Sequence, residues 1–284
     1  MLSNKVDFIF TIRVDGANPN GDPLAGNMPR VDGQGFGQIS DVCIKRKIRN
    51  RMQDMGHEIF VQSQDRIEDG YQSLEERFGS IFSEKDTNQE ITKECCEKWL
   101  DIRSFGQVIT YFKKSIGIRG PVSISVGKSI DPVDITSMQI TKSVNSMKPK
   151  NNDLRSSDTM GMKHYVDFGV YVVTGSVNCY FAEKTGFSEE DLQVLKEAIQ
   201  TLFVNDISTA RPDGSMEVMD MYWITHSSKI GDVSSSRIRE LLLHDKPSEE
   251  KIKPKYEDYK FRLDEKKVEE YKKLGLQIEH FRGW

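Results

Sequence analysis

The chain has 284 residues, of which 37% are hydrophobic and 30% charged, a balance typical of a globular protein that buries its own core. A net charge of −4 excludes a histone-like protein that binds polyanions with its whole surface, although a local basic stripe remains compatible with nucleic acid. No segment is apolar enough to cross a bilayer and the four cysteines lack zinc-site spacing, so we expect a cytoplasmic protein without metal or cofactor.

The first predicted element is a half-buried strand over 6–14, where apolar and polar side chains alternate. A long loop rich in glycine and proline follows, from Asp15 to about Gln38, and loops of this length are usually functional or mobile. Ser40 then resembles an N-cap and Gly56 a C-terminal stop, so a helix is predicted between them. The apolar stripe of this helix is Ile44, Ile48, Met52 and Met55.

The rest of the chain alternates between strand and helix patterns. The predicted elements are a short strand over 57–62, helices near 74–82 and 91–100, a strand over 121–126, a long hairpin over 135–163, one long or two shorter strands over 164–182 broken near Gly175, a helix opened by a Ser188–Asp191 capping box, a core strand over 216–224 and a short helix over 236–243. The final segment is dense in both charge signs and is expected to be a surface appendage.

Without its insertions, the predicted order is strand, helix, strand, strand, helix, strand. This is the ferredoxin-like order of RNA-recognition domains and places the chain in the α+β class. We expect one body over residues 1–245, with a helical insertion at about 66–118 and a projecting hairpin at about 135–163. Residues 246–284 form the charged C-terminal appendage.

The strongest sign of a ligand is a basic run in the first predicted helix. Lys45, Arg46, Lys47, Arg49 and Arg51 lie within seven residues that contain no acid. On a helical wheel these cations flank the apolar stripe on both sides, so the helix can pack on a sheet and still present charge to phosphates. The alternative is a solvated helix face, since most charge runs are only that. We favour nucleic acid because no acid compensates the run.

Two further segments have a structural and a functional interpretation. The loop acids Asp15, Asp22 and Asp32 suit either tight turns or a divalent cation, but no His or Glu lies nearby to complete a metal site. At the base of the hairpin, Met160 and Met162 are either core residues or a wedge between bases. The histidines are dispersed and no nucleophile motif is present, so an enzyme is not expected.

Several segments, in order, resemble the CRISPR-associated backbone subunit that coats the guide RNA in the type I-C surveillance complex, Cascade. The segments that carry the resemblance are 18–23 (NPNGDP), 26–32 (GNMPRVD), 41–50 (DVCIKRKIRN), 120–125 (GPVSIS), 128–132 (KSIDP), 159–164 (TMGMKH), 185–192 (TGFSEEDL) and 210–212 (ARP). They extend from the first strand to about His244. One such motif alone is weak, whereas the set in this order is specific.

The resemblance implies an RNA-recognition-like palm with a helical insertion and a thumb hairpin. It implies that copies stack along the guide RNA (crRNA) among other Cascade subunits, and that the guide pairs with target DNA. The residues that the resemblance assigns to RNA binding are Asn20, Arg30, Lys45, Arg46, Arg49, Lys163 and His164. Where family members often carry basic residues, this chain has Met162 and Asp213. One alternative is a Mg²⁺-dependent RNA endonuclease subunit, as in type III complexes, with Asp22 or Asp32 as the catalytic aspartate, and another is a scaffold that contacts only other subunits.

Overall fold

The computed structural model describes residues 2–141, 160–247 and 254–284. The strands of its main sheet are β1 (Val6–Ala17), β4 (Phe36–Ile39), β7 (Val122–Ile124), β8 (Gly127–Pro132), β9 (Ile135–Thr141), β10 (Met160–Val177), β11 (Met216–Thr225) and β14 (Gln277–Arg282). This sheet is antiparallel with the order β14-β11-β1-β10-β8-β4, and β7 and β9 also pair with β10. Separate two-stranded sheets are β2 (Gly21–Asp22) with β3 (Met28–Pro29), β5 (Gly106–Ile109) with β6 (Ile116–Arg119), and β12 (Leu242–Leu243) with β13 (Arg262–Leu263).

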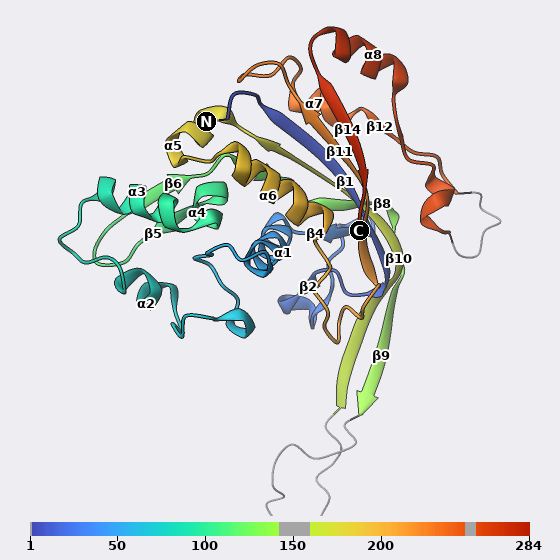
Figure 1. Cartoon of the computed structure of the whole chain (residues 1–284). Coiled ribbons are helices and arrows are strands. Elements are labelled where there is room, and N and C mark those ends of the chain that lie inside the picture. Colours follow the sequence, from blue (N-terminus) through green and yellow to red (C-terminus); the bar gives the residue numbers. More distant parts are fainter. Residues whose placement is uncertain (1, 142–159, 248–253) are drawn as a thin grey trace, which may run out of the picture.

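Helices cover the sheet and form a lobe beside it. They are α1 (Asp41–Asp54), α2 (Leu74–Gly79), α3 (Asn88–Lys98), α4 (Leu100–Phe105), α5 (Cys179–Thr185), α6 (Glu189–Gln200), α7 (Ser235–Arg239) and α8 (Glu265–Lys273), with 3₁₀ turns η1 (Pro23–Ala25), η2 (Gln64–Arg66) and η3 (Tyr256–Tyr259). Figure 1 shows α1 and α6 over one face of the sheet, the lobe of α2, α3 and α4 to one side, and β9 with β10 leaving the body as a hairpin. Within the described residues, no helix combines the length and apolar character that a membrane span requires.

The larger core lies between the sheet and helices α1 and α6. Alternate residues of β1 point into it, and the apolar stripe of α1 packs against them. Its fully buried residues include Phe8, Phe10, Ile12, Ile44, Ile48, Met52, Leu195 and Ile199. The α1 prediction is confirmed, with the Ser40 hydroxyl accepting a hydrogen bond from the Cys43 amide at 3.3 Å. The Ser188–Asp191 capping box of α6 is confirmed as well.

The second face of β1 is covered too, so the prediction of a half-buried strand is wrong. Asp7, Ile9 and Thr11, which alternate with the core residues, are at most 2% exposed. Ile9 belongs to a second core with Ile238 and Leu241 at α7, Tyr271 of α8 and neighbouring residues. The covering residues come from the C-terminal third of the chain, which a local alternation pattern cannot reveal.

The segment after Lys246 therefore belongs to the body, in contrast to the expected surface appendage. Its last strand, β14, pairs antiparallel with β11 and extends the main sheet. Tyr256 and Tyr259 of η3 are buried against Val170 on the second face of the sheet. The Tyr256 hydroxyl donates a hydrogen bond to the carboxylate of the buried Asp220 of β11.

A buried polar cluster joins the beginning of β1 to the end of β11. His226 Nδ1 accepts a hydrogen bond from the Asp232 amide at 2.9 Å, so its Nε2 carries the proton that is shared with Asp7 Oδ2 at 2.8 Å. Lys5 Nζ lies 2.9 Å from the same carboxylate oxygen. Burial raises the pKa of the Asp7 carboxyl, but the hydrogen bonds from His226 and Lys5 outweigh burial and leave this pKa below its usual value.

The lobe beside the sheet has its own core, which contains Phe60, Phe78, Ile91 and Trp99. Helices α2 and α3 confirm the two predicted helices, and α4 continues beyond them. The strand predicted over 57–62 is wrong, because the backbone amides of Phe60 and Val61 donate to the Asp101 carboxylate at 2.8 and 3.1 Å and not to a neighbouring strand.

The hairpin is formed by β9 and the first part of β10, in a register that pairs Thr141 with Met160 and Ile135 with Val166. The predicted tip between them lies outside the described residues. The same strand continues into the main sheet as far as Val177, so the chain contains one long strand without a break at Gly175. A Cβ at Gly175 would lie 2.2 Å from the Phe8 ring, so this glycine permits the close approach of that ring. The end of the predicted strand, around Ala182, is helix α5.

Candidate nucleic-acid interface

The five cations of α1 are all engaged by groups from the chain itself. Lys45 Nζ lies 3.0 Å from Asp41, and Arg49 Nε donates to Asp101 at 2.9 Å. Lys47 is buried beside Asp206, Arg51 Nε donates to Thr201 Oγ1 at 2.7 Å, and Arg46 Nη1 donates to the Val61 carbonyl at 2.5 Å. Asp101 and Asp206 are far from the basic run in sequence. The interpretation of an uncompensated run therefore does not hold for the folded chain.

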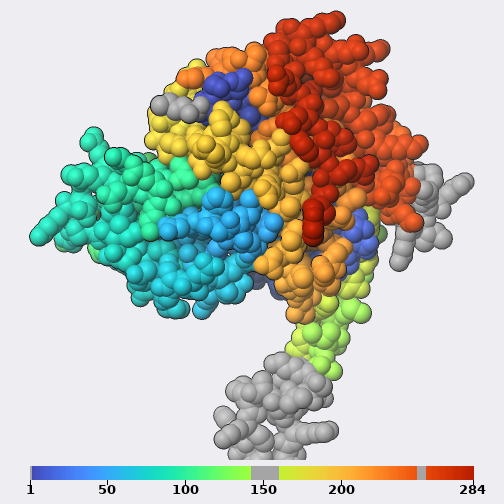
Figure 2. Space-filling view, in the orientation of Figure 1, coloured from blue at the N-terminus to red at the C-terminus, as the bar shows by residue number. Residues whose placement is uncertain are grey.

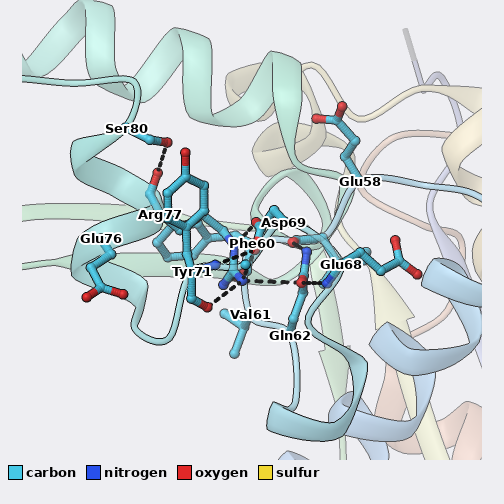
Figure 3. A network of polar contacts seen from close by, with 12 residues as sticks. Glu58, Phe60, Val61, Gln62, Glu68, Asp69, Tyr71, Glu76, Arg77 and Ser80 are labelled. Atoms are coloured by element: carbon cyan, nitrogen blue, oxygen red, sulfur yellow. Dashed lines mark hydrogen bonds and ion pairs between the residues drawn. The ribbon is translucent and has the colours of Figure 1, made fainter.

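Arg46 and Arg49 fasten the helical lobe to α1 through the segment Phe60–Val61. Asp101, which is completely buried, binds Arg49 and both backbone amides of this segment. From within the lobe, Arg77 donates to the Phe60 carbonyl at 2.8 Å and pairs with Asp69, as Figure 3 shows. Burial lowers the pKa of the Arg46 guanidinium, and the nearby Arg49 charge lowers this pKa further.

Asn20 and Arg30 lie in the loop that precedes α1. The side-chain oxygen of Asn20 accepts hydrogen bonds from the Ser40 amide at 2.9 Å and from the Ser40 hydroxyl at 2.8 Å, so Asn20 anchors the beginning of the helix. The Asn20 carbonyl accepts a hydrogen bond from the Arg30 amide at 3.0 Å. The Arg30 guanidinium pairs loosely with Asp22 at 3.4 Å, and its side chain is 37% exposed. Arg30 is therefore the more accessible of the two predicted RNA contacts.

The loop aspartates Asp22 and Asp32 are both engaged by groups of the chain itself. Asp22 caps the 3₁₀ turn that follows it, accepting a hydrogen bond from the Leu24 amide at 3.1 Å. Asp32 accepts hydrogen bonds from two backbone amides, and Lys128 Nζ lies 2.8 Å from its carboxylate. The hydrogen bond from Lys128 holds the pKa of Asp32 below its usual value. In the described parts of the chain, no group of three His, Cys, Asp or Glu residues is arranged to hold a metal ion.

Lys163 and His164 lie on β10 at the base of the hairpin, and adjacent residues of a strand face opposite sides. His164 shares one side with Met160 and Met162, and its Nδ1 lies 2.8 Å from the Ser137 hydroxyl. Lys163 is paired with Met138 and therefore lies on the other side.

Apolar side chains are exposed on both sides of the hairpin. Met160 and Met162 are 64% and 56% exposed on one side, and Met138 and Ile140 are 48% and 50% exposed on the other. The alternative that these methionines are core residues is therefore wrong for the isolated chain. Figure 2 shows the hairpin standing clear of the body. Exposed apolar side chains on a projecting element are typical of a surface that contacts a ligand or a partner.

The predicted contacts in the loop and the hairpin lie near one end of the sheet, whereas Arg46 and Arg49 contact the helical lobe. Ala17 at the end of β1 pairs with Val166 of β10, so the loop that carries Asn20 and Arg30 begins beside the hairpin base. The Asn18 amide then donates to the Ala210 carbonyl at 2.9 Å, which places the loop before β11 at the same end. This loop carries Arg211, a cation within the segment 210–212 that resembles the family but not among the predicted RNA contacts.

A groove of about 1270 Å³ lies between the main sheet and the C-terminal segment, next to the base of the hairpin. Among the described residues that line it, acids outnumber bases. The acids are Asp15, Asp131, Asp134, Asp167, Glu217 and Glu257, and the bases are Arg13, Lys246 and Lys255. A groove with this charge repels phosphate, so it does not fit an RNA path.

Comparison with known proteins identifies the family. A sequence model of the CRISPR-associated protein Cas7 matches residues 4–264, which is most of the chain. The chain belongs to the Cas7 family. A curated relative, the CRISPR-associated protein Cas7 of Haloferax volcanii, is 24% identical over 212 residues. That match covers 68% of this chain and 62% of the relative, so it spans less than two thirds of the relative's length.

A solved structure supports the fold of this Cas7 chain. It is a chain described as part of a CRISPR RNA-guided surveillance complex before nicking, with a TM-score of 0.50 and 14% sequence identity. The match covers 78% of each chain. At this identity the similarity establishes the mixed α+β architecture with a large antiparallel sheet.

Proposed function

We propose that this Cas7 protein is a non-catalytic, crRNA-binding backbone subunit of a type I-C Cascade complex. Several copies oligomerise along one guide RNA and present it for pairing with target DNA in antiviral defence. Family membership supports the assignment to CRISPR defence, and the ordered set of sequence segments supports type I-C. The observation that carries the RNA-binding role is the projecting hairpin, with Met160 and Met162 exposed beside His164.

The body corresponds in this proposal to an RNA-recognition-like palm. The strand order β11-β1-β10-β8, with α1 and α6 packed on one face, supports this assignment because it is the ferredoxin-like arrangement. RNA-recognition domains commonly stack bases on the open face of the sheet. Here that face is covered by Tyr256, Tyr259 and Tyr271, so the proposed RNA path runs over the loops and the hairpin.

Each part of the path has a chemical role. The exposed methionines insert beside a base and unstack it, which interrupts the guide at regular intervals when several copies bind. Lys163, His164 and Arg30 contact phosphates, which makes binding independent of sequence and dependent on salt. Lys45, at 23% exposure, remains accessible on α1. Recognition of the target is left to base pairing.

The proposal assigns no catalytic step to the loop aspartates. The carboxylate of Asp22 serves an N-cap and an ion pair with Arg30, and that of Asp32 serves two amides and Lys128. These contacts give both residues structural roles in a tight loop. RNA cleavage that requires Mg²⁺ and disappears in Asp22→Ala or Asp32→Ala would favour the endonuclease alternative.

A gel-shift titration on labelled guide-length RNA in the presence of Mg²⁺ tests the proposal. We expect a ladder of slower species over intact RNA, because several copies bind one strand. With 2-aminopurine placed along the RNA, fluorescence should rise where a base is unstacked, and Met160→Ser with Met162→Ser should reduce this rise. Ile230→Ser is a matched control, since Ile230 is 76% exposed and lies far from the hairpin. A single band without a shift at low salt would refute RNA coating by this chain.

A further inference from the structure

Two cations from different elements share one carboxylate oxygen beside the proposed RNA path. Asp206 Oδ2 accepts from Lys47 Nζ of α1 and from Arg211 Nε of the loop before β11, the latter at 2.8 Å. The Lys47 side chain is 5% exposed, whereas that of Arg211 is 27% exposed. Burial lowers the pKa of Lys47, and the Asp206 charge counteracts this shift. When both cations are protonated, one positive charge remains uncompensated in this cluster.

The two outer nitrogens of the Arg211 guanidinium remain available, and these are the atoms that bind phosphates in a bidentate contact. Its Nε is used by Asp206, while Nη1 and Nη2 have no hydrogen-bond or ion-pair partner among the described residues. Arg49 on α1 is also held at Nε, by the buried Asp101, but its side chain is only 13% exposed and lies over the Phe105 ring. A guanidinium held at Nε presents its two outer nitrogens as a fixed fork, which matches two oxygens of one phosphate.

The loop that carries Arg211 is held at several points. Ser208 and Arg211 exchange backbone hydrogen bonds of 2.9 and 3.0 Å, which closes a tight turn. The Ala210 carbonyl accepts from the Asn18 amide, and Pro212 follows directly with a fixed φ. Because the turn and the Asp206 contact restrict the side chain, little freedom is lost when a ligand binds.

The position of Arg211 fits the same RNA path. Through Asn18, its loop lies beside the end of β1, whose Ala17 pairs with Val166 at the base of the hairpin. Asp213 lines the same shallow depression as Arg211 but forms no ion pair with it in the described structure. An accessible cation with free donors therefore lies at the end of the sheet from which the hairpin projects.

We propose that Arg211 binds a guide-RNA phosphate and that Asp206, neutralised by the buried Lys47, is a positioning residue for its guanidinium. This inference rests on the proposed RNA-coating function and adds a contact that the sequence motifs do not predict. The ligand class is the phosphodiester of single-stranded RNA. Arg211 contributes one charge and two donors per copy, whichever base is attached.

The experiment measures the Kd of purified protein for a labelled, guide-length RNA at several salt concentrations. Arg211→Ala should weaken binding about tenfold at low salt and reduce the slope of log Kd against log salt by about 0.7, the value for one phosphate on a single strand. Arg239→Ala is the matched control, because Arg239 is exposed, has no ion-pair partner among the described residues and lies at the other end of β11. It should leave Kd and slope unchanged.

A charge-neutral double variant tests the positioning role of Asp206. Lys47→Met combined with Asp206→Asn removes one charge of each sign, so the net charge of the protein does not change. Weaker RNA binding in this variant, by several-fold, supports the orientation of Arg211 by the carboxylate. Binding equal to the wild type would overturn the positioning role. Where Arg211→Ala lowers the melting temperature below that of the assay, Arg211→Lys keeps a cation beside Asp206 and should still bind more weakly, because it lacks the fork.

The outcomes separate this inference from the function on which it rests. If the wild type forms a ladder on RNA and Arg211→Ala has the same Kd and slope, Arg211 is only a structural ion pair and the inference is wrong. If the wild type produces no shift at any salt concentration, the RNA-coating function fails and the inference falls with it. A reduced slope in Arg211→Ala, with Arg239→Ala unchanged, supports the phosphate contact.

Discussion

The contacts of Asp101 that hold the helical lobe to α1 predict a large loss of stability for Asp101→Ala. The Asp101 carboxylate is completely buried and accepts hydrogen bonds from the Phe60 amide, the Val61 amide and Arg49 Nε. Leaving a buried donor without a partner costs about 1–3 kcal/mol, and breaking a buried ion pair costs about 3–5 kcal/mol. These costs overlap because water enters the vacated space. We therefore expect a loss of about 4 kcal/mol in the free energy of unfolding.

Thermal unfolding followed by circular dichroism measures this effect. For a chain of this size, a loss of about 4 kcal/mol corresponds to a decrease in melting temperature of roughly 10 °C. Glu97→Ala is the matched control in the same lobe, because the ion pair of Glu97 with Lys93 spans 3.7 Å between highly exposed side chains. Exposed pairs of this kind contribute about 0–1 kcal/mol, so the control should melt within about 3 °C of the wild type.

The result that would refute this reasoning is equally specific. If Asp101→Ala changes the free energy of unfolding by less than about 1 kcal/mol, water accepts hydrogen bonds from the Phe60 and Val61 amides in the variant. The Asp101 carboxylate would then not be what holds the lobe to α1. A double-mutant cycle with Arg49→Met isolates the pair, and we expect a coupling of about 1–3 kcal/mol. A coupling near zero would mean that Arg49 is free for another role, including the RNA contact that the sequence predicted.

Three further perturbations have defined outcomes. Gly175→Val should lose more than about 3 kcal/mol in urea unfolding, because its Cβ would lie 2.2 Å from the Phe8 ring. Asp7→Asn should reduce stability most at pH 7, and the effect should shrink as pH falls below about 4. A carboxyl whose pKa is lowered in the folded state contributes stability above its unfolded pKa and loses this contribution as pH falls through the folded pKa. Urea midpoints at several pH values measure this effect. Met160→Ser with Met162→Ser should leave the melting temperature within about 2 °C, since both side chains are exposed.

Elements set by local pattern could be predicted from the sequence. The stripe Ile44, Ile48 and Met52 and the cap Ser40 define α1 within a few neighbouring residues, and the structure has this helix with the same N-cap. The alternation over 135–141 likewise predicted the hairpin strand β9. In each case the physical cause of the element lies within the segment itself.

Contacts between distant parts of the chain could not be predicted. Thr11 in β1 looks like a solvent-facing residue, but its hydroxyl lies 2.6 Å from the Tyr256 hydroxyl, 245 positions further along the chain. Ile9 is buried by residues around α7 and α8 for the same reason. Alternation reports which residues share a side of a strand, and it does not report how many sides are covered.

The same limit explains why the charge balance of the basic helix could not be predicted from the sequence. A run without acids suggests free charge, but the folded chain supplies Asp101 and Asp206 from segments 52 and 159 positions away from the cations they meet. Cationic side chains of a helix can also join a lobe to the body, as Arg46 and Arg49 do here. What distinguishes a ligand-binding cation is therefore the exposure of the donors that remain after the internal partners are counted. Arg49 and Arg211 each use Nε for a carboxylate of the chain, but Arg211, an isolated arginine in the sequence, has the more exposed side chain, at 27% against 13% for Arg49.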